Sequence, residues 1–477
     1  MQKKNNKPNI IFITIDALRA RNLGCYGYHR NTSPNLDSYA KQGVLFEKFF
    51  SSYNCSHKSF LSILSGRHVL GQDLEHYPSK REMKSFFDTG GILLSEILQK
   101  NGYKTHFLRK LFGWQKIGFD YSLKQEAQEA SKKWNIIRFI KKSNKIYNIA
   151  QYVLHNSYAI PEKLESKIRS NNTGETATNE AIEIIRQNKK NNFFLWLHYT
   201  DAHVPHIFPH SFSGKFTPKK ESKRIFEIPE FNKRNKKDIG FLKACWKAKD
   251  TVEDIIAKYD TAISYDDCLI SKIVDTLKEE DLLKDTIIFI FADHGESLKE
   301  HGLYFTHCGF YDTTFHIPLI LFGKGILKNK RIKALTQLED ITPTILDLAK
   351  IEYDPALFDG KSLVPLMTEE KDKIRESIFM EERACGLIKR GIRTEKYKYS
   401  ESPESGYSTC LLCNTNHGGT VNLYDLEKDP EENINLAKED KKILIKMKSK
   451  LNKTIKDLKT TDEKRRIKTF INKTLHR

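Results

Sequence analysis

The chain has 477 residues, of which 39% are hydrophobic and 11% aromatic, so it can bury a large core and is not globally disordered. Its formal net charge of +19 suits an anionic substrate, an anionic membrane surface or nucleic acid. Compositional drift explains the charge equally well, because lysine, asparagine and isoleucine are frequent throughout the sequence, and no nucleic-acid-binding module is recognisable.

The N-terminal segment does not match an export signal. It is basic, but its apolar run covers only residues 10–15 and ends at an aspartate, which is too short for the apolar region of a signal peptide. No stretch reaches the roughly 18 apolar residues of a membrane span. We therefore expect a cytoplasmic protein without a transmembrane segment, and the sequence leaves its oligomeric state open.

Three short apolar runs, at residues 8–15, 192–197 and 286–292, are rich in β-branched and aromatic residues. Such runs are typical of buried strands in a mainly parallel sheet. Helical patterns at residues 177–187 and 259–278 precede the second and third runs. The alternation predicts an α/β fold, with helices on both faces of a mainly parallel central sheet.

Each apolar run leads into acidic or imidazole side chains. These are Asp16 after the first run, His198, Asp201 and His203 after the second, and Asp293, His294 and Glu296 after the third. Ligands bind beyond the carboxyl ends of parallel strands, so these side chains should meet at one edge of the sheet. One such ending could be a solvated loop start, but three together favour a metal site.

Between the first two runs, the adjacent Cys55 and Ser56 are two possible nucleophiles. Residues 60–64 are typical of a short helix that stops at Gly66. Ser56 would then lie just before a helix N-terminus, where backbone N–H groups favour a bound anion. The alternative is that Ser56 or Ser59 only caps the helix.

Two further segments are expected to select the substrate. Residues 123–168 are predicted to form a helical insertion over the site. Residues 206–237 are predicted to form a loop, which is charge-rich over residues 216–237. We expect a catalytic α/β domain over residues 1–373 and a small C-terminal domain over residues 374–477. The second contains short strands, predicted at residues 378–382, 391–400 and 421–425, that form an antiparallel sheet.

The C-terminal domain closes with a lysine-rich helix over residues 435–477. Its apolar stripe should pack on the body of the protein, and membrane-surface binding is the alternative. The eight cysteines are scattered, and most should be small buried hydrophobic residues. Cys410 and Cys413 have CxxC spacing, but no second pair stands in register, so zinc binding there is the less favoured interpretation.

Several motifs follow one another along the chain, among them PNIIFITIDALRARNLGCYGY, SFLSILSGR, FFLWLHYTDAHVPH, DTIIFIFADHGESLKEHGLYFTH and NLYDLEKDPEENINLA. In this order they resemble the sulfatase branch of the alkaline-phosphatase-like superfamily. The resemblance covers almost the whole chain apart from residues 123–168 and the last few dozen. It implies an alkaline-phosphatase-like fold and a hydrolase that acts on ester bonds. The family's nucleophile position, counted back from Gly66, falls on Ser56 and leaves Cys55 one position away.

The resemblance also implies one divalent metal ion, held by Asp16, Asp293, His294 and the hydroxyl of Ser56. A dication beside a hydroxyl stabilises the alkoxide, which makes serine an effective nucleophile. The Asp-His pair is similar to the phosphonate monoester hydrolase and phosphoethanolamine transferase branches, which use manganese or zinc. Imidazole suits these metals better than calcium, so we expect manganese or zinc, with calcium possible.

Other matching positions imply roles around the metal. His203 and His307 match residues that contact the transferred group or protonate the leaving oxygen. Glu296 is expected to fix the tautomer of His294 or to bind a second ion.

Four residues form the predicted substrate-binding set: Lys58, Lys110, His198 and Asp201. Lys58 could neutralise a bound anion or be an ordinary solvated lysine. Lys110 matches the active-site lysine of the family only loosely. For His198 and Asp201, a supporting or structural role is favoured.

The departures from the family concern the nucleophile and two charged positions. Sulfatases carry Cys/Ser-x-Pro-Ser-Arg, whose first residue is oxidised to formylglycine, but the segment that begins at Ser56 reads SHKSF. Ala17 replaces a second aspartate, and His316 replaces an arginine. These changes favour a phosphate or phosphonate ester, above all a phosphodiester, from an anionic small molecule, glycan or lipid headgroup. The alternatives are a true sulfuric ester hydrolase, a phospho-headgroup transferase and a non-catalytic anion-binding protein.

Overall fold

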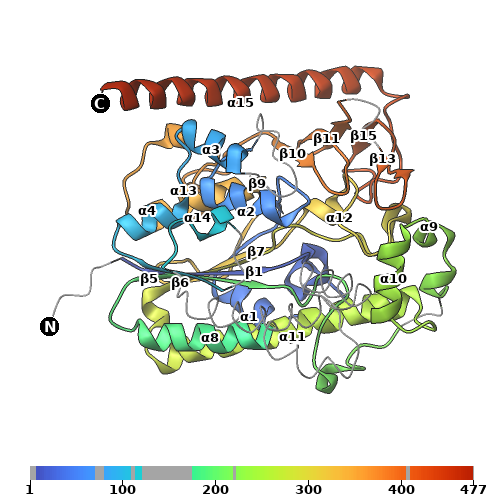
Figure 1. Cartoon of the computed structure of the whole chain (residues 1–477), viewed down its shortest axis with the longest axis horizontal. Helices are drawn as coiled ribbons and strands as arrows, with labels where there is room; N and C mark the ends of the chain where they lie inside the picture. The colour runs from blue at the N-terminus through green and yellow to red at the C-terminus, as the bar shows by residue number, and fades with distance from the viewer. Residues whose placement is uncertain are drawn as a thin grey trace, which may run out of the picture.

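The computed structural model describes residues 7–69, 80–108, 113–120, 174–218, 222–403 and 409–475 (Figure 1). A seven-stranded sheet, in the order β4-β5-β1-β6-β7-β2-β8, forms the centre of the protein. Neighbouring strands are parallel, except that β7 runs antiparallel to both β6 and β2. The strands are β1 (Asn9–Ile15), β2 (Val44–Phe46), β4 (Lys104–Leu108), β5 (Phe193–Tyr199), β6 (Thr286–Phe291), β7 (Leu319–Gly323) and β8 (Lys330–Ile332).

The three predicted central strands lie side by side as β5, β1 and β6, and every one of their residues is buried. Phe12 of β1 makes edge-to-face contacts with Phe194 and Phe289 on the two flanking strands. Aromatic pairs of this geometry contribute about 0.5–1.5 kcal/mol each beyond the burial of their area. The continuous apolar runs therefore form the centre of the core, as predicted.

Helices cover both faces of the central sheet (Figure 1). One face carries α1 (Pro34–Gln42), α8 (Gly174–Gln187) and α11 (Val252–Glu279). The other carries α2 (Ser56–Ser65), α3 (Lys80–Asp88), α4 (Leu94–Lys100), α13 (Ile341–Leu348) and α14 (Val364–Met367). The predicted α/β architecture is therefore confirmed, including the helices before β5 and β6.

A second sheet, antiparallel and four-stranded, follows in the order β10-β11-β12-β15. It consists of β10 (Ile378–Glu382), β11 (Lys389–Arg393), β12 (Tyr397–Glu401) and β15 (Val421–Asp425). The prediction of one strand over residues 391–400 is wrong, because the chain turns back between β11 and β12. Thr394 N donates a hydrogen bond to Tyr397 O (2.8 Å) and closes this turn.

Small two-stranded ladders and short helices complete the fold. β3 (Phe49–Phe50) pairs with β9 (Thr336–Gln337), and β13 (Thr409–Cys410) pairs with β14 (Thr415–Asn416). The short helices are α9 (Pro229–Asn232), α10 (Lys236–Cys245) and α12 (Asp312–Phe315). The prediction of a loop over residues 216–237 is wrong at its end, because Pro229 starts α9 and Asn235 caps α10 by accepting a hydrogen bond from Asp238 N.

The terminal helix α15 (Lys441–Leu475) lies across the second sheet (Figure 1). Met447 and Leu451 are buried there against the apolar face of the sheet, which confirms that the stripe packs on the protein. Farther along, the Arg465 guanidinium binds Asp359 Oδ1 (2.9 Å) and Ala356 O (2.9 Å), which tie the helix to the segment before α14. Within the described ranges, no helix is both long and apolar enough to cross a membrane.

The domain boundary predicted between residues 373 and 374 stays a prediction. The insertion predicted at residues 123–168 and the candidate Lys110 lie outside the described residues.

Candidate active site

Two carboxylates meet where the neighbouring strands β1 and β6 end. Asp16 follows β1 and Asp293 lies just beyond β6, and both side chains are buried. Asp293 Oδ1 accepts hydrogen bonds from His294 N (2.9 Å) and Ala17 N (3.3 Å). Within the described part of the chain, the buried Asp16 Oδ1 and Asp293 Oδ2 have no hydrogen-bond partner. Buried charges are otherwise paired or bind metals, so these two oxygens are candidate metal ligands.

The imidazole of His294 faces both carboxylates. Its Nε2 atom lies 3.4 Å from Asp16 Oδ1 and 3.8 Å from Asp293 Oδ2. Its Nδ1 atom lies 2.9 Å from Gly295 O, and because a carbonyl can only accept, Nδ1 is the donor. The tautomer is thus fixed by the Gly295 carbonyl, and the prediction that Glu296 fixes it is wrong. Such a carbonyl partner is typical of metal-binding histidines, because it leaves the other nitrogen available.

A second imidazole, that of His198 on β5, completes the cluster. His198 Nε2 lies 3.8 Å from Asp16 Oδ2 and 3.7 Å from Asp293 Oδ2, and the side chain is fully buried. One ligand atom from each of these three residues lies within 4.8 Å of the others. Carboxylate oxygens with imidazole nitrogens suit zinc or manganese. This geometry supports a metal-binding role for His198 more directly than contact with the substrate.

Burial and neighbouring charges shift the pKa values of these groups in opposite directions. Burial alone would raise the pKa of Asp293, but the His294 and His198 imidazoles and the Ser56 hydroxyl hold it well below its usual range. Burial would lower the pKa of His294, but the Asp293 and Asp16 carboxylates outweigh it and raise that pKa. The two carboxylates therefore stabilise positive charge at this point, whether that charge is a proton on His294 or a metal ion.

Ser56 and Cys55 lie in different environments at the start of α2. Cys55 is the N-cap residue and Ser56 is the first residue of the helix, so the alternative that Ser56 or Ser59 is the cap is wrong. The Ser56 hydroxyl lies 3.3 Å from His294 Nε2, within the carboxylate and imidazole cluster. The Cys55 side chain is 1% exposed, and burial raises the pKa of its thiol to about 11. Cys55 is thus a buried, unreactive thiol.

His203 and His307 line the same cluster from two other loops. The His307 ring centroid lies 4.9 Å from that of His294, and the His203 centroid lies 6.0 Å from that of His307. Both residues are only partly buried. Asn54 Nδ2 donates to His307 O (2.8 Å) and so connects the His307 loop to the segment that carries Ser56. These positions suit proton transfer to or from a group bound at Ser56.

Lys58 and Asp201, the other two described members of the predicted substrate-binding set, lie in different environments. Lys58 is 1% exposed, so the solvated-lysine alternative is wrong, and burial lowers the pKa of its ammonium. No hydrogen-bond partner of Lys58 Nζ occurs among the described residues. Asp201 is buried below α8, where its carboxylate accepts a hydrogen bond from Gly174 N (3.3 Å). Asp201 therefore supports the start of α8.

Two arginines that the sequence did not single out lie close to Lys58. Arg383 and Arg390 both bind Glu381 Oε1, at 3.0 Å and 2.9 Å, and Arg383 N donates to Asn54 Oδ1 (3.0 Å). Two guanidinium groups thus share one carboxylate, and the charge of that carboxylate also acts on the Lys58 ammonium. Nothing in the sequence signals this arrangement, because β10 meets the segment before α2 through contacts between distant residues, such as the pairing of Tyr53 with Glu381.

His316, which stands where the family has an arginine, is only partly buried and packs beside β3. Its Nε2 atom donates to Glu47 O (2.8 Å), and its ring stacks on Phe50. It therefore serves the packing around β3.

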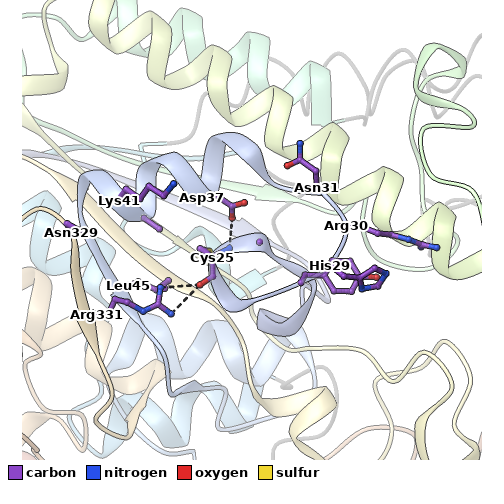
Figure 2. Close-up of a pocket in the computed structure, with 12 residues that line it drawn as sticks. Cys25, His29, Arg30, Asn31, Asp37, Lys41, Leu45, Asn329 and Arg331 are labelled. Atoms are coloured by element: carbon purple, nitrogen blue, oxygen red, sulfur yellow. Dashed lines mark hydrogen bonds between the residues drawn. The ribbon is translucent and has the colours of Figure 1, made fainter. Parts of the chain in front are cut away.

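A hollow of about 360 Å³ lies elsewhere, between α1 and the edge strands (Figure 2). Arg331 binds Cys25 O at its wall, and Cys25 N donates to Asp37 Oδ1 (2.7 Å). None of the predicted site residues lines it.

Comparison with protein families gives two matches along the chain. A family model described as "Sulfatase" matches residues 8–351. A second, described as "N-sulphoglucosamine sulphohydrolase, C-terminal", matches residues 299–460.

Three curated relatives show how far the similarity extends. A sulfatase of Formosa agariphila is 26% identical over 458 residues, which cover 92% of this chain and 84% of the relative. A choline-sulfatase of Rhizobium meliloti is 25% identical over 450 residues and covers 90% and 82%. Arylsulfatase K of Canis lupus familiaris is 26% identical over 323 residues, and the match spans only 58% of its length.

Solved structures share the fold. The phosphonate monoester hydrolase of Agrobacterium radiobacter superposes with a TM-score of 0.66 at 19% identity, covering 96% of both chains. A protein solved in complex with its substrate D-glucosamine-2-N,6-O-disulfate has a TM-score of 0.66 at 18% identity, covering 96% of this chain and 98% of the other.

Proposed function

The chain belongs to the sulfatase family of ester hydrolases, and from this premise we propose that it cleaves an anionic ester with Ser56 as nucleophile and one divalent metal ion. The observation that carries the proposal is the position of the Ser56 hydroxyl, 3.3 Å from His294 Nε2, in the cluster that also contains the buried carboxylates of Asp16 and Asp293. Asp16, Asp293, His294 and His198 would hold the ion, with manganese or zinc favoured by this donor set.

The ion, when bound, supplies Lewis-acid stabilisation of negative charge on the serine and substrate oxygens. Ser56, whose hydroxyl would lose its proton to solvent, attacks the central atom of the ester from the N-terminus of α2, where backbone N–H groups favour an anion. The bond from the central atom to the alcohol oxygen breaks as the bond to Ser56 forms. His307 or His203 protonates the departing alcohol oxygen. Lys58 and Arg383 bind the outer oxygens of the substrate and restrain their orientation. Water, deprotonated by the same imidazoles, then releases the acid from Ser56.

A phosphate or phosphonate ester, in particular a phosphodiester, is the substrate class that this serine supports best. The segment SHKSF lacks the proline and arginine by which sulfatases present their nucleophile for oxidation to formylglycine. An unmodified serine can pass through a phosphoserine that water hydrolyses, whereas a sulfated serine has no easy elimination route. The cations around Glu381 suit an anionic glycan or headgroup ester.

A sulfate ester is the second candidate, and the similarity to curated sulfatases favours it. It would require oxidation of Ser56 to an aldehyde. Mass analysis of the peptide that contains Ser56 distinguishes the two candidates, because that oxidation lowers the peptide's mass.

The test compares turnover of nitrophenyl phosphate, a nitrophenyl phosphodiester and nitrophenyl sulfate by protein loaded with manganese, zinc or calcium. We expect cleavage of a phosphorus ester with manganese or zinc, an unmodified Ser56 peptide and loss of turnover in Ser56→Ala. Sulfate cleavage with a modified Ser56 would establish the second candidate. Transfer of the phosphoryl group to an added alcohol, with little release to water, would instead identify a transferase. If the metal-loaded protein cleaves none of the three esters, both candidate activities are contradicted for simple nitrophenyl esters.

A further inference from the structure

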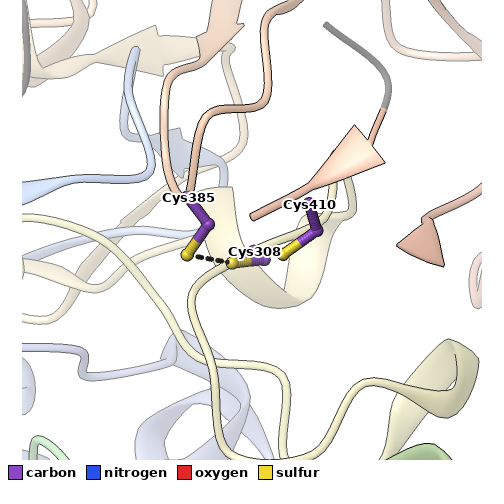
Figure 3. Close-up of side chains that lie close together, drawn as sticks. All are labelled: Cys308, Cys385 and Cys410. Atoms are coloured by element: carbon purple, nitrogen blue, oxygen red, sulfur yellow. Dashed lines mark hydrogen bonds between the residues drawn. The ribbon is translucent and has the colours of Figure 1, made fainter. Parts of the chain in front are cut away.

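Four cysteines and one histidine lie together outside the proposed active site. Cys308 belongs to the loop after His307, Cys385 to the turn after β10, Cys410 to β13, and Cys413 and His417 to the hairpin that follows. Figure 3 shows the side chains of Cys308, Cys385 and Cys410 pointing toward one another from three separate segments. The CxxC pair that the sequence presented alone thus has partners in the fold.

The ligand atoms of these residues form one continuous group. The sulfur atoms of Cys308, Cys385 and Cys410 all lie within 4.8 Å of one another, and one ligand atom each of Cys410, Cys413 and His417 do the same. Cys308 Sγ and Cys385 Sγ are 2.7 Å apart, which is longer than the about 2.05 Å of a disulfide bond. Cys410 belongs to both sets and is fully buried, as is Cys308.

The main chain holds the thiols in place. Asn414, at a φ of 52°, closes the turn between Cys410 and Cys413 by donating its N–H to Cys410 O (2.7 Å). Leu411 N donates to Cys385 O (2.8 Å), and Asn235 N donates to Leu412 O (2.8 Å). The CxxC turn is thus bonded to the segment that supplies Cys385, and it holds Cys410 beside Cys308 and Cys385 with Cys413 next to Cys410.

We propose that Cys308, Cys385 and Cys410 bind one structural zinc ion and that Cys413, the neighbour of Cys410, supplies the fourth sulfur. The His417 imidazole is hydrogen-bonded to the Cys413 sulfur (Nε2 to Sγ, 3.0 Å). Soft thiolates select zinc over magnesium, calcium or manganese. Each thiol releases its proton as its sulfur–zinc bond forms, so four protons leave and the centre carries two negative charges. Lys389, whose ammonium binds His417 O, lies beside this charge.

A cavity provides access to the cluster. It measures about 140 Å³ and borders Cys308, Cys410, Cys413 and His417. An ion can therefore enter without opening the sheets.

The proposed zinc site would restrain the loop that carries His307, a residue of the candidate active site. Cys308 directly follows His307, so a zinc ion there fixes the His307 loop to the β13–β14 hairpin and to the turn after β10. This role goes beyond the proposed function and does not depend on it, since none of the four cysteines lies among the oxygen and imidazole ligands around Asp293.

X-ray absorption at the zinc edge, with metal analysis, tests the proposal on protein purified from zinc-supplemented medium. Asp293→Asn protein is used, so that zinc at the active site does not contribute. We expect one zinc per chain with a first shell of sulfur at about 2.3 Å. Cys410→Ser in the same background should lose this zinc, whereas Cys245→Ser, a half-buried thiol of α10 outside the cluster, should retain it.

Three results would overturn the proposal: zinc bound only by nitrogen and oxygen at about 2.0–2.1 Å, protein that contains no zinc, or a disulfide that joins Cys308 to Cys385 in a non-reducing peptide map. If Cys410→Ser does not fold, the X-ray absorption spectrum of the Asp293→Asn protein with all four cysteines still shows whether sulfur surrounds the zinc. Cys413→His supplies a further check, because histidine is itself a zinc ligand and should keep the ion with one sulfur fewer in its shell.

Discussion

The hydroxyl of Ser56 lies 3.3 Å from Nε2 of His294, although 238 residues separate the two in the chain. Strand β6 brings His294 to this point and helix α2 brings Ser56, while the neighbouring Cys55 turns into the core. The fold thus distinguishes the two adjacent candidate nucleophiles, since Ser56 is partly exposed and faces His294 whereas Cys55 is buried.

The carboxylate of Asp293 should be required for both metal binding and activity. In Asp293→Asn, we expect metal content to fall to background and turnover to fall by roughly 10³-fold or more, because a catalytic ion supplies several kcal/mol of transition-state stabilisation. Metal analysis in manganese buffer, with nitrophenyl ester kinetics, measures both. Asp281→Asn, at an exposed position with a positive φ that asparagine tolerates, is the control. Full metal content in Asp293→Asn would remove Asp293 from the ligand set.

His198 should bind or orient the metal without taking part in bond cleavage. We expect His198→Gln to weaken metal affinity by about 10–100-fold and to recover most of its turnover when the metal concentration is raised. The measurement is a titration of activity against free manganese or zinc. An unchanged midpoint of the metal titration would show that His198 only packs against Phe60, whose ring centroid lies 4.9 Å away.

Lys58 should bind the anionic part of the substrate. Lys58→Met keeps the length of the side chain and removes its charge, so we expect KM to rise by about 10–100-fold, the cost of one charge-assisted hydrogen bond. The value of kcat should change little, because the contact is made with substrate and transition state alike. Separate determination of kcat and KM checks this. An unchanged KM in Lys58→Met would indicate that the lysine only offsets the negative charge of Glu381.

The buried carboxyls of Asp201 and Asp266 should make stability depend on pH. Burial raises the pKa of Asp201 to about 6, and burial together with the Asp201 charge raises the pKa of Asp266 well above its usual range. Groups with raised folded-state pKa values stabilise the fold fully below the unfolded pKa of about 3.9, and this contribution is lost as pH rises through the folded values.

In Asp266→Asn the pair can no longer carry two charges. Relative to the wild type, we expect the variant to gain on the order of 1–3 kcal/mol in unfolding free energy between pH 4 and pH 8. Urea denaturation across this range measures the difference. Parallel pH profiles for the two proteins would show that the pair does not titrate in this interval.

Elements specified by local pattern could be predicted from the sequence, and elements specified by distant partners could not. The strands β1, β5 and β6 are continuous apolar runs, and the side chains that follow them had to meet once the sheet was parallel. The division of residues 391–400 into β11 and β12 was missed because the turn at Thr394 contains neither glycine nor proline. Arg383 and Cys308 gave no signal, because their partners belong to other parts of the chain.

The most direct test of the account is a paired kinetic comparison of Ser56→Ala and Cys55→Ala on the best nitrophenyl phosphorus ester, at saturating manganese or zinc. Metal content and thermal unfolding of both variants establish that each is folded and loaded. We predict that Ser56→Ala loses turnover by on the order of 10⁴-fold, as removal of an enzyme's nucleophile does, while Cys55→Ala stays within about 10-fold of the wild type. Retained turnover in folded, metal-loaded Ser56→Ala, or loss confined to Cys55→Ala, would contradict Ser56 as the nucleophile.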